Sequence, residues 1–422
     1  MRIGLINIGD ELLLGKVLNT NAFDLARWIG ELGHELAFTL AIGDGIETIA
    51  ATLRDCRGEG KDALPRCDSL LITGGLGPTQ DDVTREAVAE FLGVPLEYSA
   101  DAEVWLAEWL SVKSQVITEG QKRQLYVPQG STALKNPVGT ACGFRVDVQG
   151  LSVFAFPGVP SEFRTMFDLH CRPSLLRRDA VLLRKRVHTF GFAESRQREL
   201  FRGLKFPEGF RFSSLPTESG VALSLEAFVE NEKIPEQVIL LADVWEDLLS
   251  RLPPEYIVDR EGSTLPETVF RLLMERHATV SVAESCTAGA LGYLITELPG
   301  SSAIFKQGYL TYADESKNSL LHVSTETLKQ HGAVSEAVAL EMAQGCLAAA
   351  DSDYAVAITG IAGPDGGTAE KPVGLVYIAV ASPKGSEVKR FLFRGDRKIN
   401  RWLSAYSAMN LLRMFIINDL QR

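Results

Sequence analysis

The stretch CDSLLITGGLGPTQDDVTREAVAEFLG (67–93) decides the fold of the first part of the chain. It begins as an apolar strand, passes through glycines and two aspartates, and continues as a helix. The same order precedes it, with strands expected over 2–10 and 35–44 and helices over 21–33 and 46–56. Strands that alternate with helices form a parallel, doubly wound sheet with right-handed crossovers. We therefore predict an α/β domain over residues 1–176.

The rest of the chain separates into two further parts. Residues 177–255 contain strand-like runs and two helical patterns, which predicts a small α+β domain. LPPEYIVDREGSTLPE (252–267) has the composition of a linker and ends in a helix start, with Ser263 or Thr264 as the N-cap. A second α/β pattern occupies 262–422. Its strands are expected near 279–283, 304–311, 354–359, 374–381 and 387–393, and its helices near 265–276, 287–297, 335–349 and 398–417.

Length, charge and cysteine usage exclude several classes of protein. A chain of 422 residues is too long for one core, so two or three domains are expected. The net charge of −11 argues against a broad nucleic-acid or anionic-membrane surface, because phosphate groups are bound by clustered Lys and Arg. The six cysteines form no CxxC pair, and neither a signal peptide nor a transmembrane run is visible. We expect a cytoplasmic protein without nucleic-acid or membrane partners.

The loop TGGLGPTQDDVT (73–84) predicts a site for a metal ion and phosphate. Glycines let backbone N–H groups approach a phosphate, and a helix N-terminus favours an anion. Loops that follow neighbouring parallel strands meet at the carboxyl edge of the sheet, and carboxylates there suit Mg²⁺ or a similar ion. The residues expected at this site are Asp10, Glu11, Thr79, Asp81 and Asp82. The alternative is that the aspartates only cap the helix and the glycines only form a turn.

The stretch VSVAESCTAGALG (280–292) places a second polar turn between a strand and a helix. Ser285 at this turn can face a cleft, where the helix dipole stabilises a developing anion. A serine nucleophile needs a base, and no histidine is an obvious one. Lys317 is the better partner, because a partly buried lysine can deprotonate a serine. Cys286 is the rival nucleophile, although a thiol with no nearby histidine is more typical of packing.

Two later loops supply further polar groups to the last domain. ITGIAGPDGGT (358–368) offers Thr359 and glycine amides to an oxyanion or a phosphate. FRGDRKINRW (393–402) offers Arg397 and Arg401 near a helix start, where they suit a phosphate or carboxylate. A purely structural interpretation stays open, in which the serine and threonine of the turn are helix caps and the lysine is solvated.

The motifs of the first half occur in the order of a known family. GDELLLG…NTN, TGGLGPTQDDVT, NPVGTACGF and PGVPSEF resemble the N-terminal half of the competence/damage-inducible protein A (CinA) family. That half is similar to the molybdopterin-binding domain of molybdenum-cofactor biosynthesis proteins. The resemblance implies hydrolysis of ADP-ribose to AMP and ribose 5-phosphate with a divalent metal ion of the Mg²⁺ or Co²⁺ class. It places Thr79, Asp81 and Asp82 in the phosphate and metal loop of the family. With the argument from the sheet edge, the expected metal ligands are Asp81, Asp82 and Asp10, and the expected phosphate-binding residues are Gly74, Gly75, Gly77 and Thr79.

The motifs of the last domain resemble the C-terminal domain of the same family. They are AESCTAG, PGSSAIFKQGYLTYADESK, HGAVSE, ITGIAGPDGGT, EKPVGLVY and GDRKINR. That domain is similar to bacterial nicotinamide mononucleotide (NMN) deamidase, so the resemblance implies hydrolysis of NMN to nicotinic acid mononucleotide and ammonia without a cofactor. It implies Ser285 as nucleophile, Lys317 as base, Tyr312 in support, and Thr359, Arg401 and Gly289 in substrate binding. Ala288 replaces a usual glycine, and Asp314 replaces a common asparagine.

The middle part completes the predicted architecture. GFAESRQRELF (191–201) resembles the linker domain of the family, a truncated KH-like fold. RNA binding is not expected there, because the chain is acidic and no GxxG clamp is visible. We predict two αβα domains joined by this linker domain, and a homodimer. The alternatives are that only one domain is active, or that the chain is a binding protein linked to competence or DNA damage.

Overall fold

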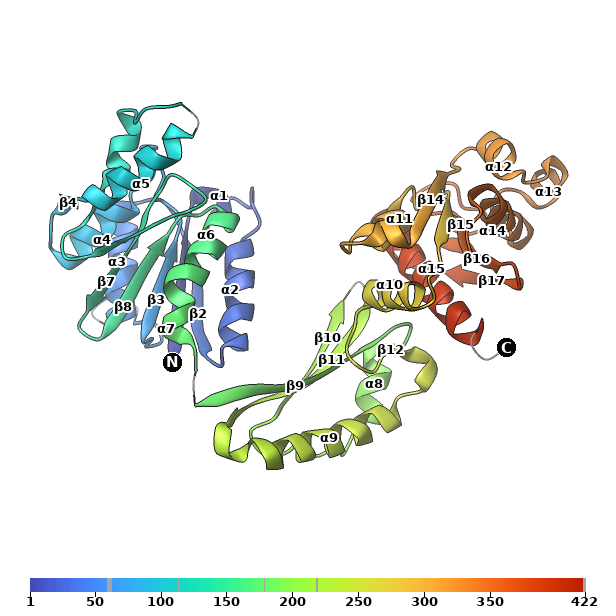
Figure 1. The fold of residues 1–422 in the computed structure, drawn as a ribbon, viewed down its shortest axis with the longest axis horizontal. Coiled ribbons are helices and arrows are strands. Elements are labelled where there is room, and N and C mark those ends of the chain that lie inside the picture. The colour runs from blue at the N-terminus through green and yellow to red at the C-terminus, as the bar shows by residue number, and fades with distance from the viewer. Residues whose placement is uncertain (59–62, 113, 178, 218, 420–422) are drawn as a thin grey trace. The chain divides into compact units, whose positions relative to one another are not determined.

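The computed structural model describes residues 1–58, 63–112, 114–177, 179–217 and 219–419. Its contacts divide the chain into two units, which Figure 1 traces from the blue N-terminal strands to the red C-terminal helix. The first unit is Met1–Leu182 with Phe228–Asn231, and the second is Leu183–Ala227 with Glu232–Arg422. The predicted boundaries of three domains stay a prediction.

The first unit is built on a six-stranded sheet in the order β2-β1-β3-β8-β7-β6. The strands are β1 (Arg2–Ile8), β2 (Glu35–Ile42), β3 (Ser69–Thr73), β6 (Thr132–Leu134), β7 (Gly143–Val148) and β8 (Leu151–Phe156). The four strands β2, β1, β3 and β8 run parallel to one another. β1 and β3 are apolar along nearly their whole length because helices cover both faces of the sheet. Their carboxyl ends therefore meet at one edge.

Two helical layers enclose this sheet, as predicted. One core joins Ile3 and Leu5 to α2 (Thr20–Glu31) and α6 (Pro160–Met166). The opposite core joins Ile6 and Ile8 of β1 to α3 (Ile46–Arg57) and α4 (Thr84–Leu92). The shorter elements are α1 (Asp10–Leu13), β4 (Leu96–Tyr98), α5 (Ala100–Ser111), β5 (Tyr126–Pro128) and α7 (Arg172–Leu175). The predicted strands and helices before residue 93 are confirmed.

The predicted parallel sheet contains one strand, β7, that runs against the others. β7 pairs antiparallel with both β8 and β6. Gln149 and Gly150 connect Val148 to Leu151, and both have positive φ values, 47° and 87°. A two-residue turn of this kind matches the twist of a hairpin, so β8 returns directly beside β7 without a crossover helix.

The second unit begins with a small sheet in the order β10-β11-β9-β12. Its elements are β9 (Ala180–Thr189), α8 (Glu194–Leu200), β10 (Arg211–Thr217), β11 (Gly220–Glu230), α9 (Ile234–Arg251) and β12 (Ile257–Asp259). Trp245 and Leu248 of α9 pack on Val187 and Leu223 of the sheet. β12 lies inside the stretch that we predicted as a linker, and it pairs with β9. The KH-like character of this part stays a prediction.

A five-stranded sheet forms the rest of the second unit, in the order β14-β13-β15-β16-β17. The strands are β13 (Val280–Glu284), β14 (Phe305–Leu310), β15 (Tyr354–Gly360), β16 (Leu375–Ser382) and β17 (Gly385–Leu392). β13 runs parallel to β14 and β15, whereas β16 and β17 are antiparallel additions. The helices are α10 (Leu265–Glu275), α11 (Ala290–Thr296), α12 (Asp314–Leu321), α13 (Thr325–His331), α14 (Glu336–Ala350) and α15 (Arg397–Asp419).

Helices cover both faces of this sheet as well. α10, α11 and α15 share one core with β13 and β15, and α12 and α14 share the other. α10 begins at the predicted cap, because the Thr264 side chain accepts from Glu267 N–H while the Glu267 carboxylate accepts from Thr264 N–H. None of the described helices combines the length and apolar character that crossing a bilayer requires.

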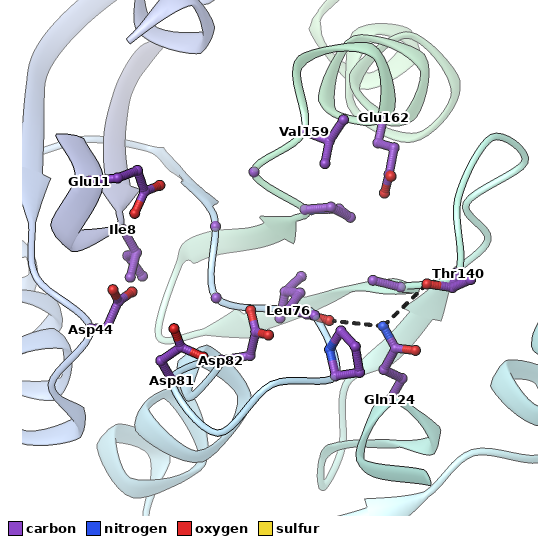
Figure 2. Close-up of a pocket in the computed structure, with 18 residues that line it drawn as sticks. Ile8, Glu11, Asp44, Leu76, Asp81, Asp82, Gln124, Thr140, Val159 and Glu162 are labelled. Atoms are coloured by element: carbon purple, nitrogen blue, oxygen red, sulfur yellow. Dashed lines mark hydrogen bonds between the residues drawn. The ribbon is translucent and has the colours of Figure 1, made fainter. Parts of the chain in front are cut away.

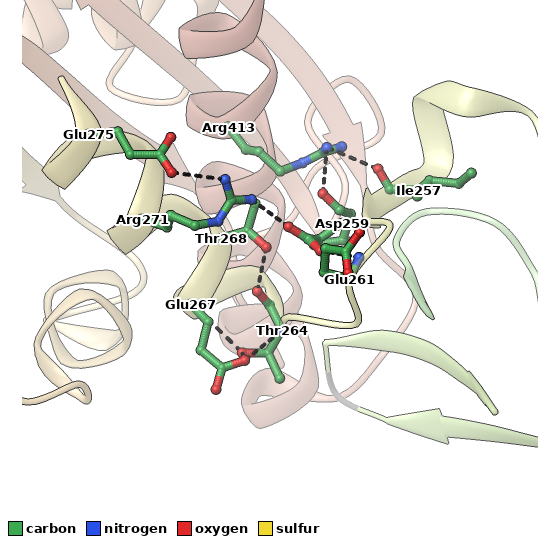
Figure 3. Close-up of polar contacts among 10 residues, drawn as sticks. Ile257, Asp259, Glu261, Thr264, Glu267, Thr268, Arg271, Glu275 and Arg413 are labelled. Atoms are coloured by element: carbon green, nitrogen blue, oxygen red, sulfur yellow. Dashed lines mark hydrogen bonds and ion pairs between the residues drawn. The ribbon is translucent and has the colours of Figure 1, made fainter. Parts of the chain in front are cut away.

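Arg413 of α15 fastens β12 to the five-stranded part of the second unit (Figure 3). The side chain is 3% exposed, and its guanidinium donates to the carbonyls of Ile257 at 3.0 Å and Val258 at 3.1 Å. Burial lowers the pKa of Arg413 to about 10, and the charge of Asp259 partly opposes this shift. Asp259 itself pairs with Arg271 of α10. Part of the stretch 252–267, which we predicted as a linker, is therefore held in place by the buried guanidinium of Arg413.

Replacing Arg413 should destabilise the second unit. Arg413→Met removes the donors of buried carbonyls, and each unpaired group costs about 1–3 kcal/mol. We expect a loss of roughly 2–5 kcal/mol in the free energy of unfolding of this unit, measured by urea denaturation. Arg390→Met, at an exposed position on β17, is the matched control. Equal stability of both variants would contradict the proposed role of Arg413.

Candidate functional sites

A cavity of about 480 Å³ lies at the carboxyl ends of β1, β3 and β8 in the first unit. This volume is in the range of small-molecule sites. Ile8, Gly74 and Gly158 bring the three strand ends into its wall. The predicted loop 73–84 supplies more of the lining than any other segment, so the structure brings this loop to the expected edge.

Gly74 sets the path of the loop after β3. Its φ is 107°, and a Cβ atom there would lie 2.1 Å from the Ile8 carbonyl oxygen. The Gly74 N–H donates to the Phe156 carbonyl at 3.0 Å, so this amide is not available to a phosphate as predicted. Among the described residues, the N–H groups of residues 75–77 have no protein acceptor, and these residues line the cavity. These amides are therefore the ones in the loop that remain available to an anion.

Carboxylates gather on one side of the cavity. Figure 2 shows Glu11, Asp44, Asp81 and Asp82 on that side. Burial raises the pKa of Asp44, and the negative charges of Asp10, Glu11 and Asp81 raise it further, although a hydrogen bond from the Asp10 N–H opposes the shift. Repulsion of this kind is relieved by a bound cation. Asp44 was missed by sequence reasoning, because it follows a different strand from the motif.

The loop aspartates are held in place by Thr79. Asp82 Oδ2 accepts from Thr79 N–H at 2.8 Å and from the Thr79 hydroxyl at 2.5 Å. The hydroxyl also bonds the Asp81 carboxylate, which lowers the pKa of Asp81. Thr79 and Asp10 do not line the cavity in the structure, although both were predicted there. Asp10 instead donates its N–H to Asp44 at 3.0 Å.

The donor chemistry fits one kind of metal site. In the part of the chain that the structure describes, no three His, Cys, Asp or Glu side chains are grouped to hold an ion by themselves. Mg²⁺ often takes only one or two protein carboxylates, with water and substrate phosphates as the other ligands. Asp81 and Asp82 fit a metal ion of that type, shared with a phosphate on the neighbouring amides.

In the second unit, a buried glutamate shapes the turn after β13. The Glu284 carboxylate accepts from the N–H groups of Gly289 at 2.9 Å, Leu291 at 3.2 Å and Gly292 at 2.8 Å. Ala288 takes the left-handed conformation with a φ of 49°. α11 therefore begins at Ala290, later than the predicted residue 287. No role was predicted for Glu284, because its partners are selected by the folded turn.

The hydrogen bonds of this turn decide which of its amides remain available to a ligand. Three of the turn amides are already used: Ser285 N–H donates to Ile358 O at 3.0 Å, Ala288 N–H to Ser285 O at 3.2 Å, and Gly289 N–H to Glu284. Within the described residues, the N–H groups of Cys286 and Thr287 have no such acceptor. These two amides are available to a developing anion, whereas the N–H of Gly289, a residue predicted to bind substrate, is already used.

Lys317 is buried close to this turn. Its side chain is 1% exposed, and Nζ donates to the Tyr312 carbonyl at 3.2 Å and to Asp314 Oδ1 at 3.3 Å. The positive charge of Lys317 reaches the thiol of Cys286, the neighbour of Ser285. Among the described residues, no hydrogen bond joins Lys317 to Ser285. The serine–lysine dyad stays a prediction.

The residues predicted to bind or support the substrate in this unit differ in their exposure and in whether their polar groups are already hydrogen-bonded. Arg401 donates to Thr287 O at 2.7 Å, and its Nε lies buried without a partner among the described residues. Tyr312 is 61% exposed, and its hydroxyl accepts from Arg397 at 3.4 Å. The Thr359 hydroxyl donates to a main-chain carbonyl at 2.7 Å, so its hydrogen is already used. Arg401 is therefore the predicted binding group that lies directly beside the turn.

Both halves of the chain match known families. Residues 262–416 match the family described as "CinA C-terminal domain", and residues 4–177 match the one described as "Probable molybdopterin binding domain". A competence-damage inducible protein of Caldanaerobacter subterraneus is 37% identical over 99% of this chain and 98% of its own. A competence-damage inducible protein of Caldicellulosiruptor saccharolyticus is 38% identical over 99% of this chain and 100% of its own. The competence/damage inducible protein CihA of Agrobacterium tumefaciens, a crystal structure, is 39% identical over 36% of this chain and 93% of its own, with a TM-score of 0.36.

The rival nucleophile can be tested by its reactivity. Burial raises the pKa of Cys286 to about 12, so about one thiol in ten thousand is ionised at pH 8. We expect iodoacetamide to label the partly exposed Cys67 before Cys286 in the native protein, as measured by mass spectrometry. Labelling of Cys286 should accelerate only as the pH approaches 12. Faster labelling of Cys286 than of Cys67 at pH 8 would show an activated thiol.

Proposed function

The chain belongs to the CinA family, and we propose that it hydrolyses two different nucleotides, one in each unit. The second unit hydrolyses NMN to nicotinic acid mononucleotide and ammonia. The first unit hydrolyses ADP-ribose to AMP and ribose 5-phosphate with a divalent metal ion. The observation that carries the proposal is that, within the described part of the chain, each unit leaves two or three loop amides without protein acceptors beside groups that suit the reaction. Such amides stabilise developing or resident negative charge.

For the amide hydrolysis, the proposed nucleophile is the Ser285 hydroxyl. Lys317 accepts its proton, and the serine oxygen attacks the carboxamide carbon. The N–H groups of Cys286 and Thr287 hold the resulting oxyanion, and Arg401 binds the phosphate. Ammonia leaves with a proton from the lysine, and water then cleaves the acyl-enzyme. This route requires Lys317 Nζ to exchange a present partner for Ser285.

For the diphosphate hydrolysis, the loop amides of residues 75–77 bind one phosphoryl group. Asp81 and Asp82 hold the metal ion, which neutralises diphosphate charge and activates a water when bound. Thr79 keeps both carboxylates in position, so its contribution is to ligand geometry. Arg123 donates to the Asp82 carbonyl at 3.1 Å and to Glu86 at 2.8 Å, which fixes the loop against α4.

Two other functions remain as alternatives. One domain can be inactive while it keeps its fold. Alternatively, the chain is a binding protein linked to competence or DNA damage, in which case substitution of Asp81 or Ser285 would leave its role unchanged. A homodimer and a cytoplasmic location belong to the same proposal and are tested separately by a sizing column and by cell fractionation.

Ammonia release from NMN tests the second unit. Ser285→Ala should lower turnover at least about 1,000-fold, because loss of a nucleophile removes the covalent route. Lys317→Met should cause a similar loss, whereas Cys286→Ala should stay within a few-fold of the wild type. Thermal melting of each variant controls for folding. An active Ser285→Ala variant beside an inactive Cys286→Ala variant would make the thiol the nucleophile.

Formation of AMP from ADP-ribose tests the first unit. EDTA should abolish the reaction and added Mg²⁺ or Co²⁺ should restore it, since carboxylates alone repel the diphosphate. Asp81→Asn and Asp82→Asn should each reduce turnover at least about 100-fold. Asp101→Asn, on the exposed side of α5, is the matched control. Unchanged AMP formation in EDTA would contradict a metal-dependent site.

A further inference from the structure

The side of the cavity away from Asp44, Asp81 and Asp82 is lined by Gln124, Thr140 and Glu162. Gln124 lines the cavity and is 1% exposed. Its Nε2 donates to the Leu76 carbonyl and to the Thr140 hydroxyl, each at 3.5 Å. Because the Leu76 carbonyl can only accept a hydrogen bond, the Gln124 side-chain atom that faces it is the nitrogen Nε2. The Gln124 Oε1 atom is then the unpaired end, buried and without a partner among the described residues.

Glu162 supplies a second acceptor on the same side. Figure 2 shows Glu162 with Gln124 and Thr140, away from the four carboxylates. One carboxylate oxygen of Glu162 accepts from the Asn136 amide at 2.7 Å. A Cβ atom at Gly139 would lie 2.3 Å from Glu162 Cδ, so the glycine leaves room for the carboxylate. Burial raises the pKa of Glu162, and the hydrogen bond from Asn136 opposes this shift.

The electrostatics of the cavity decide which part of a ligand this side accepts. A diphosphate is stabilised at the loop amides and by a cation on the acidic side. At Glu162 it would meet a carboxylate that is paired with a neutral amide, and like charges repel. Neutral groups that donate hydrogen bonds would instead satisfy Glu162, which has one carboxylate oxygen bound to Asn136. The cavity is large enough to hold both parts of one nucleotide.

We propose that Gln124, Thr140 and Glu162 form a ribose subsite, and that Glu162 determines its specificity by accepting the vicinal hydroxyl groups of the sugar. Acidic side chains bind ribose hydroxyls in this way in other nucleotide sites. A site built for a hydroxyl also rejects an analogue that lacks it, because the buried acceptors are left unpaired. The inference rests on the proposed function for the presence of a nucleotide, but it concerns binding and needs no hydrolysis.

Binding of four stable compounds tests the subsite. AMP is compared with 2′-deoxy-AMP, and ribose 5-phosphate with 2-deoxyribose 5-phosphate, by titration calorimetry on the full chain. The wild type should bind the hydroxylated member of at least one pair about 10-fold more tightly. Glu162→Gln should abolish that preference, while Glu31→Gln on the exposed side of α2 should retain it. The pair that responds tells whether the ribose belongs to the nucleoside or to the sugar phosphate.

The outcomes separate this inference from the proposed function. A preference that survives in Glu162→Gln would overturn the subsite, as would equal binding of both members of each pair by the wild type. Failure of all four compounds to bind the wild type would overturn it too. If the preference depends on Glu162 but ADP-ribose is not hydrolysed, the subsite stands and the proposed reaction fails. If ADP-ribose is hydrolysed but Glu162→Gln leaves the preference unchanged, the proposed reaction stands and the subsite fails.

Discussion

Loop amides that lack protein acceptors, at the carboxyl ends of parallel strands, are the feature on which both candidate sites depend. An unpaired buried N–H group costs about 1–3 kcal/mol, so the surrounding fold has to hold such a loop open. In the second unit the Glu284 carboxylate does this by taking three neighbouring amides. In the first unit the Thr84 hydroxyl donates to Gly74 O at 2.8 Å while Gly74 N–H pairs with Phe156. The amides left over are then available to a ligand.

The two units differ in the charge that they place beside these amides. The first unit surrounds them with carboxylates, and burial together with neighbouring charges raises the pKa of Asp44. An anionic substrate can approach such a site only together with a cation. In the second unit, Lys317 and Arg401 place positive charge near the turn, so an anionic nucleotide would meet protein cations there. This contrast is the physical basis for proposing a metal-dependent reaction in one unit and a metal-free one in the other.

The differences between the predicted and observed folds concern how strands pair. The apolar runs correctly predicted β1, β3 and β13, because those strands are buried on both faces. The same runs do not report strand direction, so the hairpin of β7 and β8 was missed. β12 was predicted as part of a linker because it is short. Its strand conformation depends on pairing with β9 and on the hydrogen bonds from Arg413.

The sequence by itself determined the local features of this protein. Hydrophobic period, glycine-rich loops and the capping box at Thr264 act over a few residues, and they suffice to place strands, helices and the polar turns at strand ends. Only the tertiary structure decided which groups at those turns remain available. Asn136 binds Glu162, and Ser285 N–H donates to Ile358 O. Hydrogen bonds of this kind form only when distant segments meet, and sequence spacing carries no record of that meeting.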